Sequence, residues 1–326
     1  MLRTDFRSLI KGYKRARFYT DNFSRYFLPD SMFKTFFARK YDRLSTAEKE
    51  ELDKRVDYYI RLPHGARIDK ENAVSVGDFR YPWKKKRKHA TYFFDLFECV
   101  RCFNSKFRFK YLFGDVNTET ATPTFVKSRP ITTSATNSVL MPLNKVRHFR
   151  FIKDSKRYRD KKDMLVFRNV VRQPHRLAFL DRHFDNHLCD AGQINSDYGN
   201  PSYIKPYLSI EDQLDFKFIA CIEGNDVATN LKWVMASNSI AVMPRPKIES
   251  WYMEGTLKAD YHYIEIKDDY SDLEEKLWYY IVHPDEAEAI ISHAHEYVNI
   301  FRDADKELFI ARMVAKKYFE LTNECD

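Results

Sequence analysis

The fold is decided by the stretch FKFIACIEGNDVATNLKWVMA, residues 216–236. The apolar run at 216–222 predicts a buried strand. Gly224, Asn225 and Asp226 predict a turn, because glycine, asparagine and aspartate tolerate the backbone angles of tight turns. Residues from about 228 to 236 predict a helix whose N-terminus faces the carboxyl edge of the sheet. Strand, turn and helix in this order form the unit from which parallel α/β sheets are built.

The rest of the C-terminal half repeats this alternation. Strands are expected at 164–167, 240–243 and 261–266, and a helix at 175–184. The capping box Ser271-Asp272-Leu273-Glu274 predicts the start of another helix, and two more are expected to follow it, ending at Phe319. Repeated β-α units of this length predict a parallel, doubly wound sheet.

The N-terminal half mixes helical and strand patterns. Residues 6–37 place aromatic side chains among Arg and Lys at helical spacing and are interrupted at Pro29, which predicts two basic amphipathic helices. The capping box Ser45-Thr46-Ala47-Glu48 predicts a helix to about Arg61. The remaining expectations are an exposed basic loop at 83–88, a helix at 92–103, strands at 107–113 and 123–128, and a connector at 142–150. We therefore expect an α/β fold of two halves, residues 1–150 and 151–326, with a cleft between them.

Length and charge limit the class of protein. A chain of 326 residues that is 44% hydrophobic has enough apolar material for two domains. Residues 1–43 hold eleven Lys and Arg against four Asp and Glu, so most of the net charge of +8 lies there. This basic surface suits anionic lipid, nucleic acid or an acidic acceptor. An ordinary solvated helix face docked on a core is an equal alternative to membrane contact.

The cysteines and the apolar runs indicate a compartment. Five cysteines are an odd number, which is untypical of a disulfide framework. Cys99 and Cys102 form a C-x-x-C without a second pair or histidines at zinc-finger spacing, so they are expected to be buried thiols. Basic residues at Arg3, Arg7 and Lys11 interrupt any signal-peptide core, and no run of about 18 apolar residues occurs. We expect a protein of the reducing cytosol.

Two groups of residues suit the binding of an anion. The turn at Gly224 presents the free N–H groups of the expected helix, and Lys232 lies one turn into that helix, which fits a diphosphate. Arg168, Arg172 and Arg176 fall within nine residues and suit a guanidinium clamp on phosphate oxygens. The alternatives are an ordinary β-α connection with a solvated lysine, and a surface arginine cluster.

Carboxylates supply the candidate base. Asp115 follows the strand pattern 107–113, and a carboxylate at the carboxyl end of a strand is well placed as a general base if it faces a cleft. The alternative is a turn aspartate that caps its own loop. Glu249 and Glu254 suit ribose or sugar hydroxyls, although either also suits a solvated surface. The string Asp303-Ala304-Asp305 lies at an expected helix start, so we do not interpret it as a metal motif.

Several short motifs occur together in a fixed order. They are YLFGDV at 111–116, FVKSRP at 125–130, NKVRHF at 144–149, CIEGND at 221–226, LKW at 231–233, ASNS at 236–239, WYME at 251–254, HYIE at 262–265 and DLEEK at 272–276. In this order they resemble glycosyltransferase family 90, and most closely its bacterial lipopolysaccharide-core members. The resemblance covers roughly residues 106–301, and the combination of motifs makes it specific.

The resemblance implies a fold, a donor and a reaction. The fold is GT-B-like, with two Rossmann-like domains, a cleft between them and C-terminal helices packing back. The N-terminal domain, 1–150, binds the acceptor, and the C-terminal domain, 151–326, binds a UDP-sugar. The reaction is metal-independent transfer with inversion at the anomeric carbon to a glycan hydroxyl, in lipopolysaccharide or lipooligosaccharide core synthesis. No cofactor or metal is expected, and the location implied is cytoplasmic, at the inner membrane if the basic 1–43 region binds anionic lipid.

The resemblance also gives roles to residues. Asp115 matches the family's catalytic base, Arg168 the arginine of its aromatic-Arg-Gly motif, Arg176 the arginine that follows, and Lys232 the lysine of the diphosphate-facing helix. The remaining expected donor contacts are Arg172, Gly224, Asn225, Asp226, Asn230, and, for ribose or sugar, Ser237, Glu249 and Glu254.

Two positions depart from the family pattern. Asn169 replaces the motif glycine, which indicates a different backbone path. Asn230 stands where many members carry the diphosphate arginine, and Arg172 is the expected substitute. These departures leave a non-catalytic protein of glycosyltransferase fold as an alternative. A nucleic-acid-binding protein is a second alternative, but the charge is confined to one end and no nucleic-acid-binding signature occurs.

Overall fold

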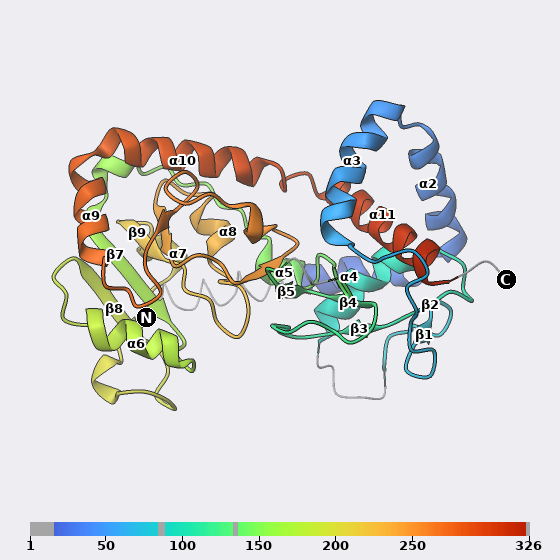
Figure 1. Cartoon of the computed structure of the whole chain (residues 1–326), viewed down its shortest axis with the longest axis horizontal. Helices are drawn as coiled ribbons and strands as arrows, with labels where there is room; N and C mark the ends of the chain where they lie inside the picture. The colour runs from blue at the N-terminus through green and yellow to red at the C-terminus, as the bar shows by residue number, and fades with distance from the viewer. Residues whose placement is uncertain (1–15, 84–88, 133–135, 324–326) are drawn as a thin grey trace.

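The computed structural model in Figure 1 describes residues 16–83, 89–132 and 136–323. The molecule is elongated. A five-stranded sheet lies at one end, and short strands under a group of helices lie at the other. No helix within these ranges is long and apolar enough to cross a membrane.

The predicted doubly wound sheet is confirmed in the C-terminal half. Its strands are β7 (Lys162–Asn169), β8 (Cys189–Gln193), β9 (Phe216–Ala220), β10 (Ile240–Met243) and β12 (Ile264–Glu265). Their order is β12-β10-β9-β7-β8, and all neighbours are parallel. The order reverses between β7 and β9, so the topological switch point lies at the carboxyl ends of these two strands.

Helices cover both faces of this sheet, which explains the nearly continuous apolar strands. On one face Phe167 and Phe218 pack with side chains of α6 (Pro174–His183), α9 (Leu273–Val282) and the start of α10 (Pro284–Asn299). On the other face Val166 and Ile219 belong to the core that includes α8 (Leu231–Val234). The short helix α7 (Ile210–Gln213) precedes β9.

The helices predicted for the N-terminal half are confirmed, apart from residues 6–15, which lie outside the described residues, and one short helix is added. Residues 16–26 are helical, and α2 (Asp30–Asp42), α3 (Thr46–Tyr59), α4 (Ala90–Val100) and α5 (Lys145–His148) follow. Ser45 and Glu48 form the predicted capping box. Cys99 and Cys102, at the end of α4, are buried free thiols, as expected.

The strands of this half do not form a Rossmann-like unit. A parallel sheet joins β3 (Tyr111–Leu112), β4 (Thr124–Val126) and β6 (Ser138–Leu140), while β1 (Val74–Ser75) pairs with β2 (Arg108–Phe109). No described residue between β3 and β6 is helical, so these strands lack the β-α connections of the Rossmann-like domain that the family resemblance implies for residues 1–150. The single strand predicted at 107–113 is divided between two sheets, and the expected connector 142–150 contains α5.

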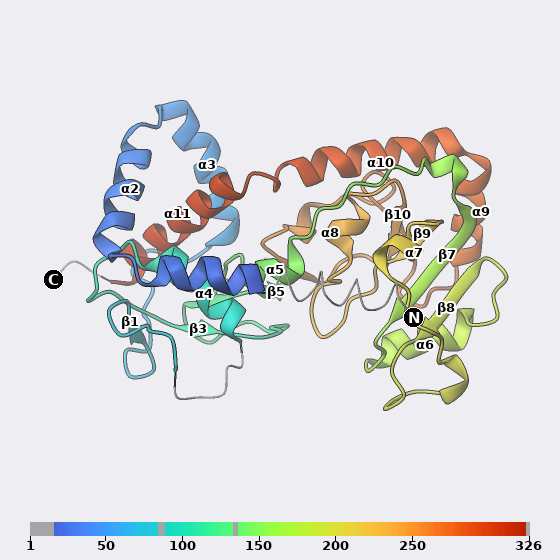
Figure 2. The ribbon, with the colours of Figure 1, turned by 180° about the vertical axis from the view of Figure 1, so that it is seen from behind.

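Two elements of the C-terminal sequence return to the N-terminal half. Helix α11 (Ala304–Thr322) packs against α3 and α4, as Figure 2 shows from behind. The prediction that the C-terminal end packs back on the N-terminal half is thus confirmed for α11. Residues 304–322 therefore belong to the N-terminal half in space, although the division at residue 150 assigns them to the C-terminal domain. Strand β11 (Ile248–Ser250) pairs antiparallel with β5 (Ser128–Pro130).

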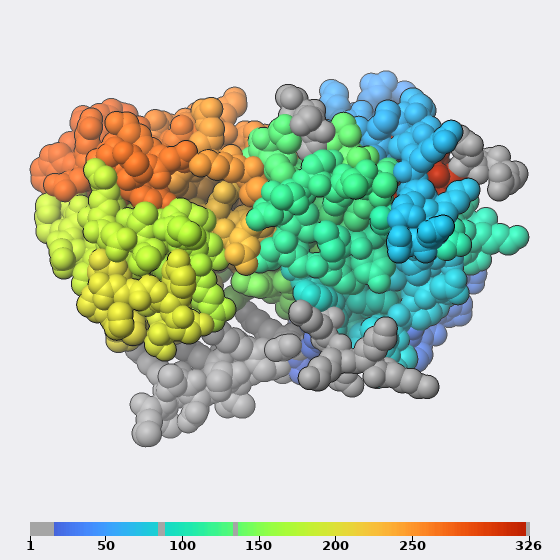
Figure 3. Space-filling model, turned by 60° about the horizontal axis from the view of Figure 1, so that its bottom comes forward, coloured from blue at the N-terminus to red at the C-terminus, as the bar shows by residue number. Residues whose placement is uncertain are grey.

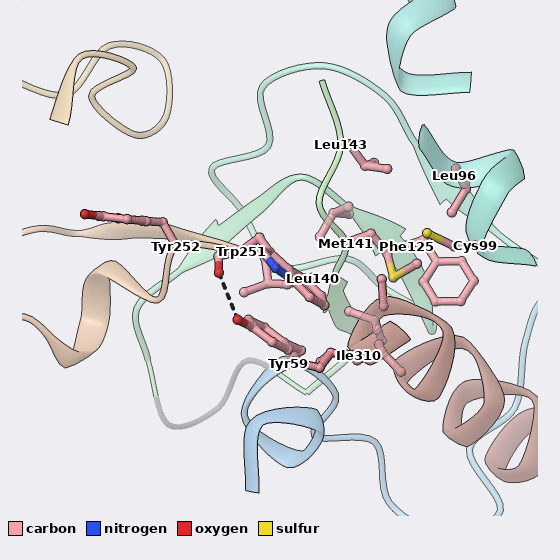
Figure 4. Close-up of a cluster of buried hydrophobic side chains, with 14 of the residues drawn as sticks. Tyr59, Leu96, Cys99, Phe125, Leu140, Met141, Leu143, Trp251, Tyr252 and Ile310 are labelled. Carbon is pink, nitrogen blue, oxygen red and sulfur yellow. Dashed lines mark hydrogen bonds between the residues drawn. The ribbon is translucent and has the colours of Figure 1, made fainter. Parts of the chain in front are cut away.

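The core continues across the contact between the halves. Figure 3 shows the green residues of the N-terminal half against the orange residues of the C-terminal half without a gap at the upper seam. In Figure 4 the Tyr59 ring stacks on Trp251 at 3.8 Å between centroids, and the Tyr59 hydroxyl donates to the Trp251 carbonyl. The side chains of the candidate site therefore rest on a well-packed core.

Candidate active site

Arg176 joins the two strand ends at the switch point. It lies in the first turn of α6, which Pro174 opens at a position that needs no backbone N–H. Its guanidinium donates from Nε to the carbonyl of Glu223, from Nη1 to Val170 and from Nη2 to Ile222, at 2.9, 2.9 and 2.7 Å. A guanidinium has five N–H groups, so two remain for another acceptor.

The charge of Arg176 has no carboxylate partner in the described part of the chain. Burial is the largest influence on it and lowers the pKa of Arg176 to about 10. A nearby cation, Arg147 of α5, lowers this pKa further. Arg147 is exposed and forms no ion pair with any described residue. Tyr270 and Asp226 partly offset this effect on the pKa of Arg176. The two arginines are nevertheless cations without an ion-pair partner among the described residues, which suits an anion.

The turn after β9 leads from Arg176 to Asp115. A Cβ atom on Gly224 would lie 3.3 Å from Arg176 Nη2, so glycine lets the guanidinium approach the backbone closely. The next residue, Asn225, receives a hydrogen bond from Gln173 and places its amide 3.5 Å from Asp115 Oδ2. Asp115 and Arg176 thus flank the same three-residue turn.

Asp115 lies at the contact between the halves and is held as a carboxylate. Its side chain is 37% exposed, and Lys127 Nζ lies 2.7 Å from Oδ1. Burial opposes ionisation, but the hydrogen bond and charge of Lys127, with the Asn225 amide, outweigh it and keep the pKa of Asp115 below its usual value. Lys127 is buried and also contacts Asp226 at 2.7 Å. A side chain that is ionised at neutral pH and partly open to solvent can accept a proton.

A cavity of about 180 Å³ opens on the other side of the Glu223–Gly224 turn. Its walls come from the end of β9, residues 227–231, the 243–248 segment and His175. Val227, Leu231 and Met243 make these walls largely apolar, and Glu254 is the buried acid among the lining residues. Typical ligand sites measure about 300–1,000 Å³, so this cavity takes one part of a ligand whose remainder extends outward.

Comparison with known proteins identifies the family. Residues 143–309 match the model of glycosyl transferase family 90. The chain is also 39% identical over 315 residues to "O-glucosyltransferase LpsA" of Dichelobacter nodosus, a match that covers 95% of this chain and 97% of that protein. The chain belongs to glycosyltransferase family 90. It is an enzyme, and this decides against the non-catalytic and nucleic-acid-binding alternatives.

The arginine clamp predicted for this glycosyltransferase is not assembled in the structure. Arg168 is buried on β7 and pairs with Asp190 at 2.7 Å, a diagonal neighbour on the adjacent strand β8. Arg172 is exposed and pairs with Asp197 at 2.6 Å. Of the three arginines, Arg176 is the one left at the switch point, because Arg168 is paired on β7 and Arg172 lies in the loop between β7 and α6.

The helix expected from 228 to 236 is also shorter than predicted. Helix α8 is a single turn, Leu231–Val234, since Ser237 Oγ donates to the Val234 carbonyl and closes the next turn. Asn230 does not cap it but donates to the Ala220 carbonyl at the end of β9. A helix of four residues lacks the aligned dipoles of a longer one, so it does not supply the expected anion site.

Lys232 and Ser237, two of the predicted ligand contacts, are already bonded within the protein. Lys232 is fully buried and pairs with Glu254 at 2.5 Å, so its ammonium is not presented to the cleft. Ser237 is buried in its turn. Glu254 keeps its place in the cavity wall and also accepts from the Ser250 N–H at 2.6 Å. Of the residues expected to hold ribose or sugar, Glu254 is therefore the one that lines the cavity.

The Glu249 side chain joins the two halves of the molecule and does not face the cavity. It lies on β11, is 1% exposed and accepts from Arg129 Nε at 2.8 Å, with Tyr58 and Arg61 also bonded to it. Its two oxygens are thus occupied by N-terminal side chains. We correct the expectation of a sugar contact here.

Sequence reasoning overlooked Lys127, Arg147 and His148 as site residues. Lys127 directly follows β4, and a charged residue at the carboxyl end of a parallel strand was the available signal. His148 is buried, and neither ring nitrogen has a partner among the described residues. Burial, with Lys232 and Lys127 nearby, lowers its pKa well below the usual value.

Within residues 16–83, 89–132 and 136–323, no group of three or more His, Cys, Asp or Glu side chains is arranged to hold a metal ion. Asp303 accepts from the N–H groups of Asp305 and Lys306, so it is the N-cap of α11. Metal independence stays a prediction.

Proposed function

We propose that this glycosyltransferase transfers a glucosyl residue from UDP-glucose to a hydroxyl of a lipopolysaccharide acceptor, with inversion and without a metal ion. The observation that carries the proposal is the placement of Arg176 and Asp115. An arginine that has no carboxylate partner among the described residues and an ionised aspartate lie on either side of the turn 223–225, at the switch point of a parallel sheet. Ligands of open α/β sheets bind at this position.

The order of residues along the turn suggests how the donor lies. Glu223 lines the cavity, Gly224 adjoins the Arg176 guanidinium, and Asn225 contacts Asp115. A uridine in the apolar cavity would place its diphosphate beside the two free N–H groups of Arg176. The sugar would then extend toward Asp115. The Glu254 carboxylate lines the same cavity, but both of its oxygens already accept hydrogen bonds from Lys232 and Ser250. Binding of the ribose hydroxyls by Glu254 would therefore require these bonds to be shared.

The reaction proposed is a single displacement. Asp115 accepts the proton of the acceptor hydroxyl as its oxygen bonds to the anomeric carbon, and the bond from that carbon to the diphosphate breaks. Attack from the face opposite the leaving group inverts the anomeric configuration. Negative charge develops on the departing UDP, and Arg176 and Arg147 stabilise it by the electrostatic role that a metal ion has in other transferases.

The sugar and the acceptor rest on the comparisons. The relative from Dichelobacter nodosus is named an O-glucosyltransferase, which favours glucose. The sequence motifs resemble the lipopolysaccharide-core branch of the family, which favours a lipid-linked acceptor on the cytoplasmic side. We extend the proposal to a site between two halves, as in GT-B enzymes, although the described part of the N-terminal half lacks a Rossmann-like sheet. Residues 1–150 would mainly bind the acceptor and 151–303 the donor, and the basic 1–43 region would contact anionic lipid.

Donor hydrolysis and calorimetry test the proposal. The protein should bind UDP and slowly hydrolyse UDP-glucose in the absence of an acceptor, and ADP, GDP and CDP should bind more weakly. Proton NMR of the released sugar should show the β-anomer first, since UDP-glucose carries the α-configuration. Absence of UDP binding would overturn the donor assignment, and release of the α-anomer would overturn the inverting mechanism.

A further inference from the structure

One end of the molecule exposes a row of large apolar side chains. They are Phe27, Leu28, Met32, Phe36 and Trp83, with 71, 42, 47, 64 and 56% of their surface exposed. We call these five residues the apolar edge. Four of them lie along the turn from the helical residues 16–26 into α2, at the right of Figure 1. Single exposed apolar residues are common on protein surfaces, whereas large apolar side chains exposed close together usually mark an interaction surface.

The members of the apolar edge are neighbours. The Trp83 ring stacks on Phe27 with 6.4 Å between centroids and 19° between planes. Met32 and Phe36 are four residues apart on α2, so they share one helix face. Two separate parts of the chain thus build this surface.

The apolar edge is not the unused face of the first helix. Within residues 16–26, Phe18, Tyr19 and Phe23 pack edge-on against Phe94 of α4. The amphipathic helix predicted for membrane contact is therefore docked on the core. Between residues 16 and 43, the large apolar side chains that stay exposed are the ones that follow this helix.

The charge beside the apolar edge is positive. Residues 31–41 contain Lys34, Arg39 and Lys40 and no acidic residue. The nearest acid in sequence, Asp30, is neutralised by Arg101 at 2.7 Å and Arg80 at 3.3 Å. In the sequence, five consecutive basic residues at 84–88 follow Trp83, although they lie outside the described residues.

We propose that the apolar edge inserts into the headgroup region of an anionic bilayer, with the neighbouring lysines and arginines on lipid phosphates. The inference rests on the proposed lipid-linked acceptor, which this contact would bring to the enzyme. Aromatic residues beside basic ones are the composition of interfacial membrane contacts. A protein partner fits less well, because lysine is depleted from protein interfaces.

Vesicle sedimentation tests the inference with a matched control. The double variant Phe27→Ser, Phe36→Ser removes the two most exposed rings. The control, Trp278→Ser with Val282→Ser, removes side chains that are 59 and 52% exposed on α9, at the opposite end of the molecule. With vesicles of phosphatidylcholine containing phosphatidylglycerol, binding should fall about tenfold or more in the first variant only. Circular dichroism melting of both variants should match the wild type.

Salt separates insertion from charge attraction. Wild-type binding should weaken but persist as salt rises, whereas the residual binding of the Phe27/Phe36 variant should disappear. Equal binding by both variants, or no wild-type binding to any vesicle, would overturn the inference. So would sedimentation velocity showing a dimer that only the Phe27/Phe36 variant lacks, since the surface would then bind a second copy. UDP affinity, measured on the same samples, should stay unchanged and tests the proposed function separately.

Discussion

Replacing Arg176 with methionine should remove most of the affinity for UDP. It should also lower the melting temperature, because the guanidinium donates to the carbonyls of Glu223, Val170 and Ile222. The free protein holds this guanidinium at an energetic cost. A fall of the pKa from 12.5 to about 10 disfavours the charged form by about 3 kcal/mol, because a tenfold change in an acidity constant is worth about 1.4 kcal/mol. A bound diphosphate would recover part of this cost by neutralising the charge.

The expected loss follows from the two free N–H groups. One charge-assisted hydrogen bond contributes about 1.5–3 kcal/mol, so the loss of even one raises the dissociation constant for UDP about 10- to 150-fold in Arg176→Met. Isothermal titration calorimetry measures this directly. Arg172→Met is the matched control, because Arg172 lies one helical turn earlier in sequence but is exposed and paired with Asp197. Its UDP affinity should change less than about twofold.

The control also decides between two accounts of the diphosphate site. The sequence pattern treats the arginines at 168, 172 and 176 as one clamp, whereas the structure keeps only Arg176 at the switch point. If Arg172→Met loses as much affinity as Arg176→Met, the clamp is correct and the reasoning from the structure fails. Wild-type affinity in Arg176→Met would remove the diphosphate from this position altogether.

Three further predictions concern stability and metal. Glu249→Ala should lower the free energy of unfolding by about 3–5 kcal/mol in urea denaturation, because it strands the buried charge of Arg129; a loss below about 1 kcal/mol would contradict the role of Glu249 in joining the halves. The pKa of His148 is depressed in the folded state, so at low pH the unfolded chain takes up a proton that the folded protein does not. As pH falls below about 6, the free energy of unfolding of the wild type should therefore fall by about 1.4 kcal/mol per pH unit relative to His148→Gln. Parallel pH profiles of the two proteins would refute this. Activity should survive EDTA, and complete loss that manganese or magnesium restores would refute the metal-free mechanism.

Much of the C-terminal fold could be predicted from sequence because its signals are local. The strand at 216–222 is apolar except for Lys217, which is typical of a sheet covered on both faces, and β9 is buried over its whole length. Ser45 and Glu48 form the capping box that their spacing predicts. The single strand predicted at 107–113 is wrong, because Arg108–Phe109 and Tyr111–Leu112 pair with strands of two different sheets. Alternation of apolar and polar residues along a sequence does not show which strands pair.

The site was predicted less completely, because pairing partners come from distant sequence. Lys232 and Glu254 are 22 residues apart and Arg129 and Glu249 are 120 apart, and each pair consumes charges that looked free in the sequence. Spacing along a strand and helix could not show that Arg168 would meet Asp190. Conversely, Arg176 became prominent only because the topology sets the ends of β7 and β9 side by side.

The most direct test of the account is the turnover of Asp115→Asn measured beside its affinity for UDP. The substitution keeps the size of the side chain and removes its ability to accept a proton. General-base catalysis contributes about 10²–10⁴-fold, so kcat should fall by that factor. The UDP dissociation constant should stay within about twofold of wild type, because Asp115 lies on the sugar side of the turn. Normal turnover, or a loss of UDP binding equal to the loss of turnover, would contradict the assignment of Asp115 as the base.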